Sequence, residues 1–288
     1  MATPAHSDPP RTVAGNRIDA RLAQGIVNQA IREAEKRMEL KPLRSPQGLG
    51  NETARRRFAA RMVKALGPCM VGSTVSRQCT RIALSSLVTF DLAKNWNGLG
   101  VTTEIWNLDP KHPRNVYPGD FFAESVKIEA FVDKHVLIRL AQRRGDTTLD
   151  GFMAALQPVW NWCQLANMTR MSGVFHIPIA EGLICCERKR IENAGPGLPD
   201  RPITRILTYL DLRAMNQFNR DAWDRLTGAG VLEMRPRFPR FSDPSPEEEA
   251  ILAAMRQEGA AWEGRRDVAI QRVKTRAPAV TETADLQI

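Results

Sequence analysis

Long hydrophobic runs are absent from this chain of 288 residues. No stretch reaches the roughly 18 consecutive apolar residues that a transmembrane helix needs, so the sequence excludes such a helix. The first residues lack a basic segment followed by an apolar core, so no secretory signal is predicted. Hydrophobic residues make up 43% and charged residues 25%, a balance typical of soluble globular proteins. We therefore expect a soluble, cytoplasmic protein with no membrane partner.

Cysteine patterns and cofactor motifs are also missing. The five cysteines are odd in number and irregularly spaced, which argues against a disulfide framework and favours buried thiols. No Cys-x-x-Cys or His-x-x-x-His pair suggests zinc. Neither glycine-rich phosphate-binding motif occurs, and no Gly-x-Ser-x-Gly elbow is present. The sequence therefore predicts no metal and no cofactor.

Acidic residues are scarce in the first third of the chain. Residues 1–88 hold 15 Lys/Arg against 6 Asp/Glu, whereas the remaining residues hold 26 of each kind. The whole net charge of +9 is therefore concentrated in this segment. Such asymmetry suggests an electrostatic partner, most simply a phosphate backbone, because bound cations release condensed counterions. Deleting the segment should then weaken nucleic-acid binding and flatten its salt dependence. The alternative is a solvated basic region with no ligand.

The first third is predicted to be all-helical. Apolar spacing indicates helices over 18–38, from about 51 to 66, and over 74–93. Asn51 is a good N-cap for the second helix, and the helix is expected to stop at Gly67-Pro68. This second helix carries the candidate nucleic-acid-binding cations, which are Arg55, Arg56, Arg57, Arg61 and Lys64.

Beyond residue 120, the pattern mixes strands and helices. Alternating residues from Ser125 indicate a strand, and Asp133 can cap the helix that follows it. Pro158 should kink or divide the next helix, which opens at 146–148. The further expected elements are a hairpin over 174–187, a strand over 203–210, a helix over 213–226, an edge strand over 231–241 and a helix from Ser245.

These elements predict an α+β protein with a basic all-helical N-terminal module, a small antiparallel sheet with packed helices, and a helical C-terminal extension. The expected divisions are a flexible lead 1–16, a basic helical module 17–94, an α+β domain 95–242, a helical extension 243–276 and a flexible tail 277–288.

The helix over 134–144 carries the most suggestive group of side chains. At about 100° per residue, His135, Arg139 and Arg143 share one face. Histidine can act as a general acid or base near neutral pH, and arginine can hold a phosphate and stabilise charge developing on it. This face could therefore support phosphodiester cleavage. The alternative is structural, with the arginines paired to carboxylates elsewhere.

The pattern His-x-x-x-Arg-x-x-x-Arg before a hairpin and a Thr-containing strand resembles the toxin-type ribonucleases of the barnase, EndoU, colicin and RelE-like group. The similarity covers about 125–211. It implies metal-independent RNA cleavage, with RNA favoured over DNA as the partner, and a protein partner such as an antitoxin. The candidate catalytic residues implied by this resemblance are His135, Arg139, Arg143, Thr204 and Thr208.

Two other hypotheses stay open. Glu187 and Lys189 form a Glu-x-Lys pair of the kind found in metal-dependent nucleases, with Glu181 the nearby carboxylate. Alternatively, the protein has no catalytic activity and uses its basic module to dock on nucleic acid or on an acidic protein. Catalysis requires His135 and an arginine to converge on an open surface, whereas docking does not.

Overall fold

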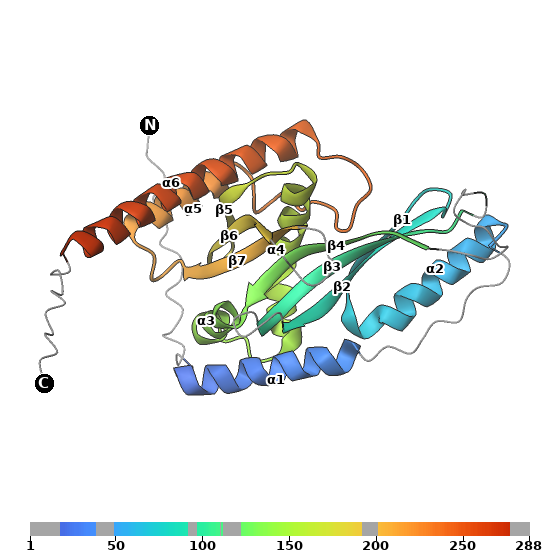
Figure 1. The fold of residues 1–288 in the computed structure, drawn as a ribbon, viewed down its shortest axis with the longest axis horizontal. Coiled ribbons are helices and arrows are strands. Elements are labelled where there is room, and N and C mark those ends of the chain that lie inside the picture. The colour runs from blue at the N-terminus through green and yellow to red at the C-terminus, as the bar shows by residue number, and fades with distance from the viewer. Residues whose placement is uncertain are drawn as a thin grey trace, which may run out of the picture.

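A seven-stranded sheet organises the chain in the computed structural model, which describes residues 18–38, 49–91, 97–109, 111, 122–191 and 201–276. The strand order is β1-β2-β3-β4-β7-β6-β5 (Figure 1). Helices lie on both faces and along the β5 edge of this sheet. The predicted α+β class is therefore confirmed, but the expectation of a small antiparallel sheet is wrong.

The first half of the sheet is an antiparallel meander. Its strands are β1 (Met70–Val75), β2 (Arg81–Asp91), β3 (Asn97–Asn107) and β4 (Phe122–Asp133). β2 pairs with β3 along its whole length, from Arg81 opposite Asn107 to Asp91 opposite Asn97. The helix predicted over 74–93 is therefore wrong, and the first third is not all-helical. The border predicted at residue 94 lies between these two paired strands.

The second half joins β4 through a parallel contact with β7 (Arg201–Asp211), over residues 130–132 and 204–206. β7 then pairs antiparallel with β6 (Gly182–Ile191), and β6 pairs with β5 (Gly173–Ile179). The predicted hairpin is confirmed, and Ala180 and Glu181 form its turn. The parallel contact makes the sheet mixed.

Three of the helices that share the main hydrophobic cluster with the sheet come from the first 168 residues. They are α1 (Ala20–Met38), α3 (Lys134–Arg144) and α4 (Leu149–Met168). Leu87 of β2 and Leu99 of β3 belong to the same cluster. Pro158 lies within α4, which continues through it as one helix, so the expected division is wrong.

The remaining N-terminal helix, α2 (Glu52–Leu66), is followed by the short 3₁₀ helix η1 (Gly67–Cys69). Its Phe58 packs in a second cluster with Ile82 and Leu84 of β2. Ile82 and Leu84 are each an odd number of residues away from Leu87, so their side chains point to the other face of β2. Helix α2 therefore lies on the opposite face of β2 from the main cluster. β2 thus buries side chains on both faces, which explains why its sequence lacks a strand-like alternation.

Helices α5 (Gln217–Gly228) and α6 (Pro246–Arg276) lie by the β5 edge, at the other end of the sheet from α2 (Figure 1). A bidentate ion pair from Arg225 to Glu258 links the two helices. Between them, residues 231–241 form turns and irregular backbone, so the edge strand predicted there is wrong.

Several helix-end signals in the sequence are confirmed, but the cap expected from Asp133 is wrong, because its side chain makes no capping bond at the start of α3. The side chains of Asn51 and Thr148 accept bonds from backbone N–H groups in the first turns of α2 and α4. Ser245 and Glu248 exchange side-chain to backbone bonds at the start of α6, which is a capping box. Gly145 ends α3 with a positive φ of 80°. These signals need only neighbouring residues, so the sequence reveals them.

Within the described residues, no helix is long and apolar enough to cross a membrane. The lead predicted at 1–16 and the tail predicted at 277–288 lie outside the described residues.

Candidate functional site

The polar face of α3 lies against the edge of β7. β4 pairs with β7 only through 130–132 and 204–206, and Asp133 ends β4. The chain then enters α3, which contacts β7 beyond the end of the β4 pairing. The three side chains predicted to share a face are therefore brought together along one strand edge.

Each of these side chains makes a hydrogen bond to β7. The His135 Nε2 lies 2.8 Å from the Leu207 carbonyl oxygen. Because a carbonyl oxygen only accepts, this nitrogen carries the proton. Arg139 donates to the Thr208 hydroxyl, and Arg143 donates to the Tyr209 carbonyl at 3.0 Å. The face predicted for phosphate contact thus satisfies acceptors that β4 leaves unpaired, a structural use of the same residues.

The two threonines of β7 are not part of one site. A β-bulge shifts the register between Cys185 opposite Thr208 and Cys186 opposite Ile206. One extra residue reverses the alternation of side chains, so Thr204 and Thr208 lie on opposite faces. Thr204 is buried, and its hydroxyl donates to Asn167 of α4. Only Thr208 contacts the α3 group.

Asp133 is the carboxylate of this cluster. Its Oδ2 accepts from Arg205 Nε at 2.8 Å and lies 3.6 Å from His135 Nδ1. Its Oδ1 is buried and has no hydrogen-bond partner. The imidazole of His135 is half exposed, with 52% of its side-chain surface accessible. A carboxylate beside an accessible imidazole is the arrangement that general acid–base chemistry uses.

Sequence reasoning treated Asp133 only as a helix cap and did not select Arg205. Asp133 occupies the N-cap position but makes no side-chain capping bond, because its carboxylate is turned toward Arg205. The spacing Asp133-x-His135 was a usable signal. Arg205 lies 72 residues from Asp133 and becomes its neighbour only through the parallel pairing of β4 and β7.

A cysteine nucleophile has no place in this cluster. Cys185 lies opposite Thr208, but it is fully buried. Burial raises the pKa of the Cys185 thiol well above its usual range, and nearby Arg139 offsets this only in part. The thiol therefore stays protonated and inert near neutral pH.

The residues of the metal-dependent hypothesis lie apart. Glu181 is in the hairpin turn and forms an ion pair with Arg144, whereas Glu187 lies within β6. No group of three or more potential metal ligands occurs among the described residues. The geometry therefore gives the Glu-x-Lys pair of Glu187 and Lys189 no companion ligands in that part of the chain.

The five predicted cations of α2 divide into two groups. Arg55 donates to the carbonyls of Leu49 and Gln78, each at 3.2 Å. Arg56 donates to the carbonyl of Arg77 at 3.2 Å and pairs with Glu52. These two arginines attach α2 to the turn between β1 and β2. Of the other three cations, Arg61 has its guanidinium 5.5 Å from the centroid of the Phe58 ring.

Arg57, Arg61 and Lys64 form an exposed stripe, hereafter the α2 stripe. At 100° per residue they fall within an arc of about 60°, and they extend along about 10 Å of the helix axis. None of them forms a salt bridge with an acidic side chain in the described part of the chain. Exposed Arg77, in the turn that Arg56 contacts, adds a cation that sequence reasoning missed.

Comparison with known proteins gives no relative to argue from, because no protein-family model, curated protein or solved structure matches this chain.

Proposed function

We propose that this protein binds nucleic acid, with the α2 stripe contacting the phosphate backbone and RNA as the preferred partner. The observation that carries the proposal is the stripe itself, three exposed cations on one helix face with no acidic partner among the described residues. Such contacts supply affinity without reading sequence.

The packing and hydrogen bonds that fix α2 to the rest of the protein support this proposal. Phe58 and Met62, on the other side of the helix, are buried against the sheet. Arg55 and Arg56 hold the helix to backbone carbonyls of the neighbouring turn and of Leu49. A cationic face fixed in this way loses little backbone freedom on binding, so more of the electrostatic attraction is retained as affinity.

The test replaces the α2 stripe in the full chain with Arg57→Ala, Arg61→Ala and Lys64→Ala. The control removes the same charge from exposed residues elsewhere, with Lys189→Ala, Arg237→Ala and Arg256→Ala. Binding to an RNA duplex, the same single strand and a DNA duplex is measured by fluorescence anisotropy from 50 to 300 mM salt. The stripe variant should bind about ten-fold more weakly or worse, and its slope of log K against log salt should fall by about 2 to 3.

Equal losses in the stripe and control variants would mean that net charge alone drives binding. If the unaltered chain bound no nucleic acid at 50 mM salt, the proposal would be overturned. The docking alternative, an acidic protein such as an antitoxin, would then take its place.

RNA cleavage at α3 is a second candidate, favoured by the half-exposed His135 beside the Asp133 carboxylate. The hydrogen bonds of this face to β7 weigh against it, because Arg139 and Arg143 already hold the strand edge. The RNA from the binding test serves here too. Metal-independent cleavage would persist in EDTA, leave 2′,3′-cyclic phosphate ends, and fall by about 10²–10⁴ in His135→Ala. Intact RNA, or cleavage unchanged in a folded His135→Ala variant, would exclude this candidate.

A further inference from the structure

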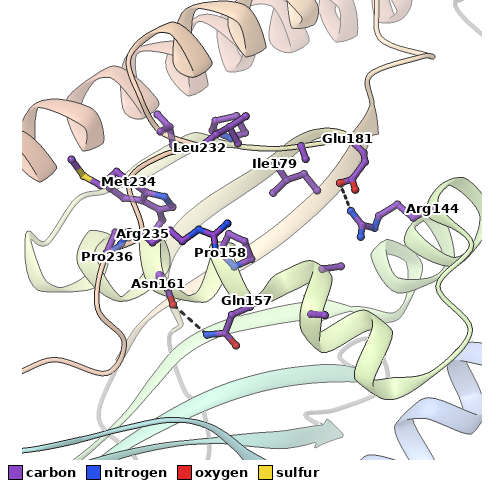
Figure 2. Close-up of a pocket in the computed structure, with 16 residues that line it drawn as sticks. Arg144, Gln157, Pro158, Asn161, Ile179, Glu181, Leu232, Met234, Arg235 and Pro236 are labelled. Carbon is purple, nitrogen blue, oxygen red and sulfur yellow. Dashed lines mark hydrogen bonds and ion pairs between the residues drawn. The ribbon is translucent and has the colours of Figure 1, made fainter. Parts of the chain in front are cut away.

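A cavity of about 520 Å³ lies between α4, the tip of the β5–β6 hairpin and residues 231–236 (Figure 2). Its size falls within the range of roughly 300–1,000 Å³ that is typical of small-molecule sites. The end of α3 contributes Arg144 to its lining. The cavity is therefore built from segments far apart in sequence.

Most of the cavity wall is apolar. The side chains that make up this part of the lining are Ala154, Ala155, Pro158, Trp162, Pro178, Ile179, Val231, Leu232, Met234 and Pro236. Trp162 is 2% exposed and belongs to the main hydrophobic cluster, so it lies behind the wall, whereas exposed Pro158 and the partly exposed Leu232 and Met234 present the apolar surface. Such a surface favours a ligand with a hydrocarbon body.

The charged groups of the lining are not balanced. Arg144 pairs with Glu181 of the lining and also with Asp146, which does not line the cavity, so Arg144 is already engaged by two carboxylates. Arg235 has no salt bridge or hydrogen bond with any described residue. Figure 2 shows its guanidinium pointing into the cavity, toward Pro158. An exposed arginine that has no ion pair among the described residues thus lies over an apolar surface.

A pair of amides completes the polar part of the lining. Gln157 Nε2 donates to Asn161 Oδ1 at 3.4 Å, and both residues come from successive turns of α4 (Figure 2). Their remaining amide N–H and C=O groups can bond a polar substituent. An apolar wall with a few polar groups is the usual composition of a small-molecule pocket.

We propose that this cavity binds a small organic anion, with a carboxylate or phosphate group on Arg235 and an apolar body against Pro158 and Leu232. Arginine suits this role because its planar guanidinium can donate two parallel bonds to either head group. The site does not rest on the nucleic-acid proposal, since none of its lining residues belongs to the α2 stripe.

The test uses isothermal titration calorimetry on the full chain with three probes that share a naphthalene ring and differ in their head group. They are 1-naphthoate, 1-naphthyl phosphate and the neutral 1-naphthalenemethanol. At least one anion should bind, and the alcohol should bind at least ten-fold more weakly. Arg235→Ala should weaken anion binding about ten-fold or more. Arg237→Ala is the matched control, because this arginine is exposed nearby but does not line the cavity. Its affinity should stay within two-fold of the unaltered chain.

The outcomes separate cleanly. Binding of naphthoate alone identifies a carboxylate site, binding of naphthyl phosphate alone identifies a phosphate site, and binding of both identifies a general anion site. The proposal is overturned if neither anion binds, if the alcohol binds as tightly as the anions, or if Arg235→Ala binds them unchanged.

Discussion

His176 belongs to β5, and its imidazole is buried where β5 packs against α6. It is 0% exposed, and neither ring nitrogen has a hydrogen-bond partner. Its ring meets the edge of Trp262 of α6 at a centroid distance of 5.8 Å. Burial lowers the pKa of His176 to about 4, although Glu258, which is paired with Arg225, opposes the shift. The folded protein therefore holds this histidine neutral.

We predict that His176 makes the fold acid-sensitive. Its pKa is about 4 when folded but near 6.5 when unfolded, so the unfolded chain takes up a proton first as the pH falls. The stability contribution is complete above about pH 6.5 and is lost between pH 6.5 and 4, for a total of about 3 kcal/mol. Urea unfolding at several pH values measures this change.

The control is His176→Leu, which fills a similar volume and breaks no hydrogen bond, since the imidazole makes none. Subtracting its pH profile from that of the unaltered chain removes the contribution of every other acid and base. Parallel profiles for the two proteins between pH 6.5 and 4 would show that His176 carries no such effect.

At the scale of elements, the packing of α6 on β5 depends on a glycine. A Cβ placed on Gly259 would lie 2.2 Å from the backbone carbonyl oxygen of Val174, closer than atoms can approach. Gly264, five residues later in the same helix, has no atom within 4 Å of such a Cβ. The two positions share one helix but differ in what faces them.

We therefore predict opposite effects of alanine at these two positions. Gly259→Ala should lower the free energy of unfolding by about 1–3 kcal/mol, because α6 must move away from β5. Gly264→Ala should raise it by up to about 1 kcal/mol through helix propensity alone. Thermal and urea unfolding of the two variants measure the difference. Equal stabilisation by both changes would show that α6 does not pack closely on β5.

The packing of β2 also explains why the helix predicted over 74–93 is wrong. Ile82, Leu84 and Leu87 look helical in spacing because β2 buries side chains on both faces. A short apolar run of this kind does not separate strand from helix by its period. What decides the matter is the long pairing of β2 with β3, which no local signal contains.

For the whole molecule, the basic first third cannot be treated as a separate part. β1 and β2 supply one end of the sheet, and α1 packs in the same cluster as α3 and α4. Removing residues 1–88 would expose the apolar cluster and most of the edge of β3. The deletion suggested by the charge distribution would therefore remove the fold together with the charge.

We predict that a chain lacking residues 1–88 loses cooperative unfolding, because it loses the α1 side of the core and most of β2, one of the two strands that pair with β3. Circular dichroism during heating would show a broad transition, and the near-ultraviolet signal would weaken. The stripe variant is the comparison, since its three substitutions are exposed and should leave the transition temperature within a few degrees. A sharp transition in the shortened chain would show instead that residues beyond 88 fold on their own.

The sequence by itself determined the features that depend on neighbouring residues. Capping side chains located the starts of α2, α4 and α6, and Gly145 located the end of α3. The β5–β6 hairpin also followed from local strand and turn chemistry. The shared face of His135, Arg139 and Arg143 followed from helical periodicity, although their catalytic role remains a prediction. Each of these signals acts within a few residues, so it is present before the chain folds.

The tertiary structure alone decided the features that depend on distant partners. The parallel contact of β4 with β7 brings Arg205 to Asp133 and leaves the strand edge that α3 occupies. The bulge in β7 separates Thr204 from Thr208, which a regular strand would have placed on one face. Residues 231–236 form a cavity wall instead of an edge strand. Pairing, register and cavity shape arise from contacts across the chain, so one sequence read locally cannot contain them.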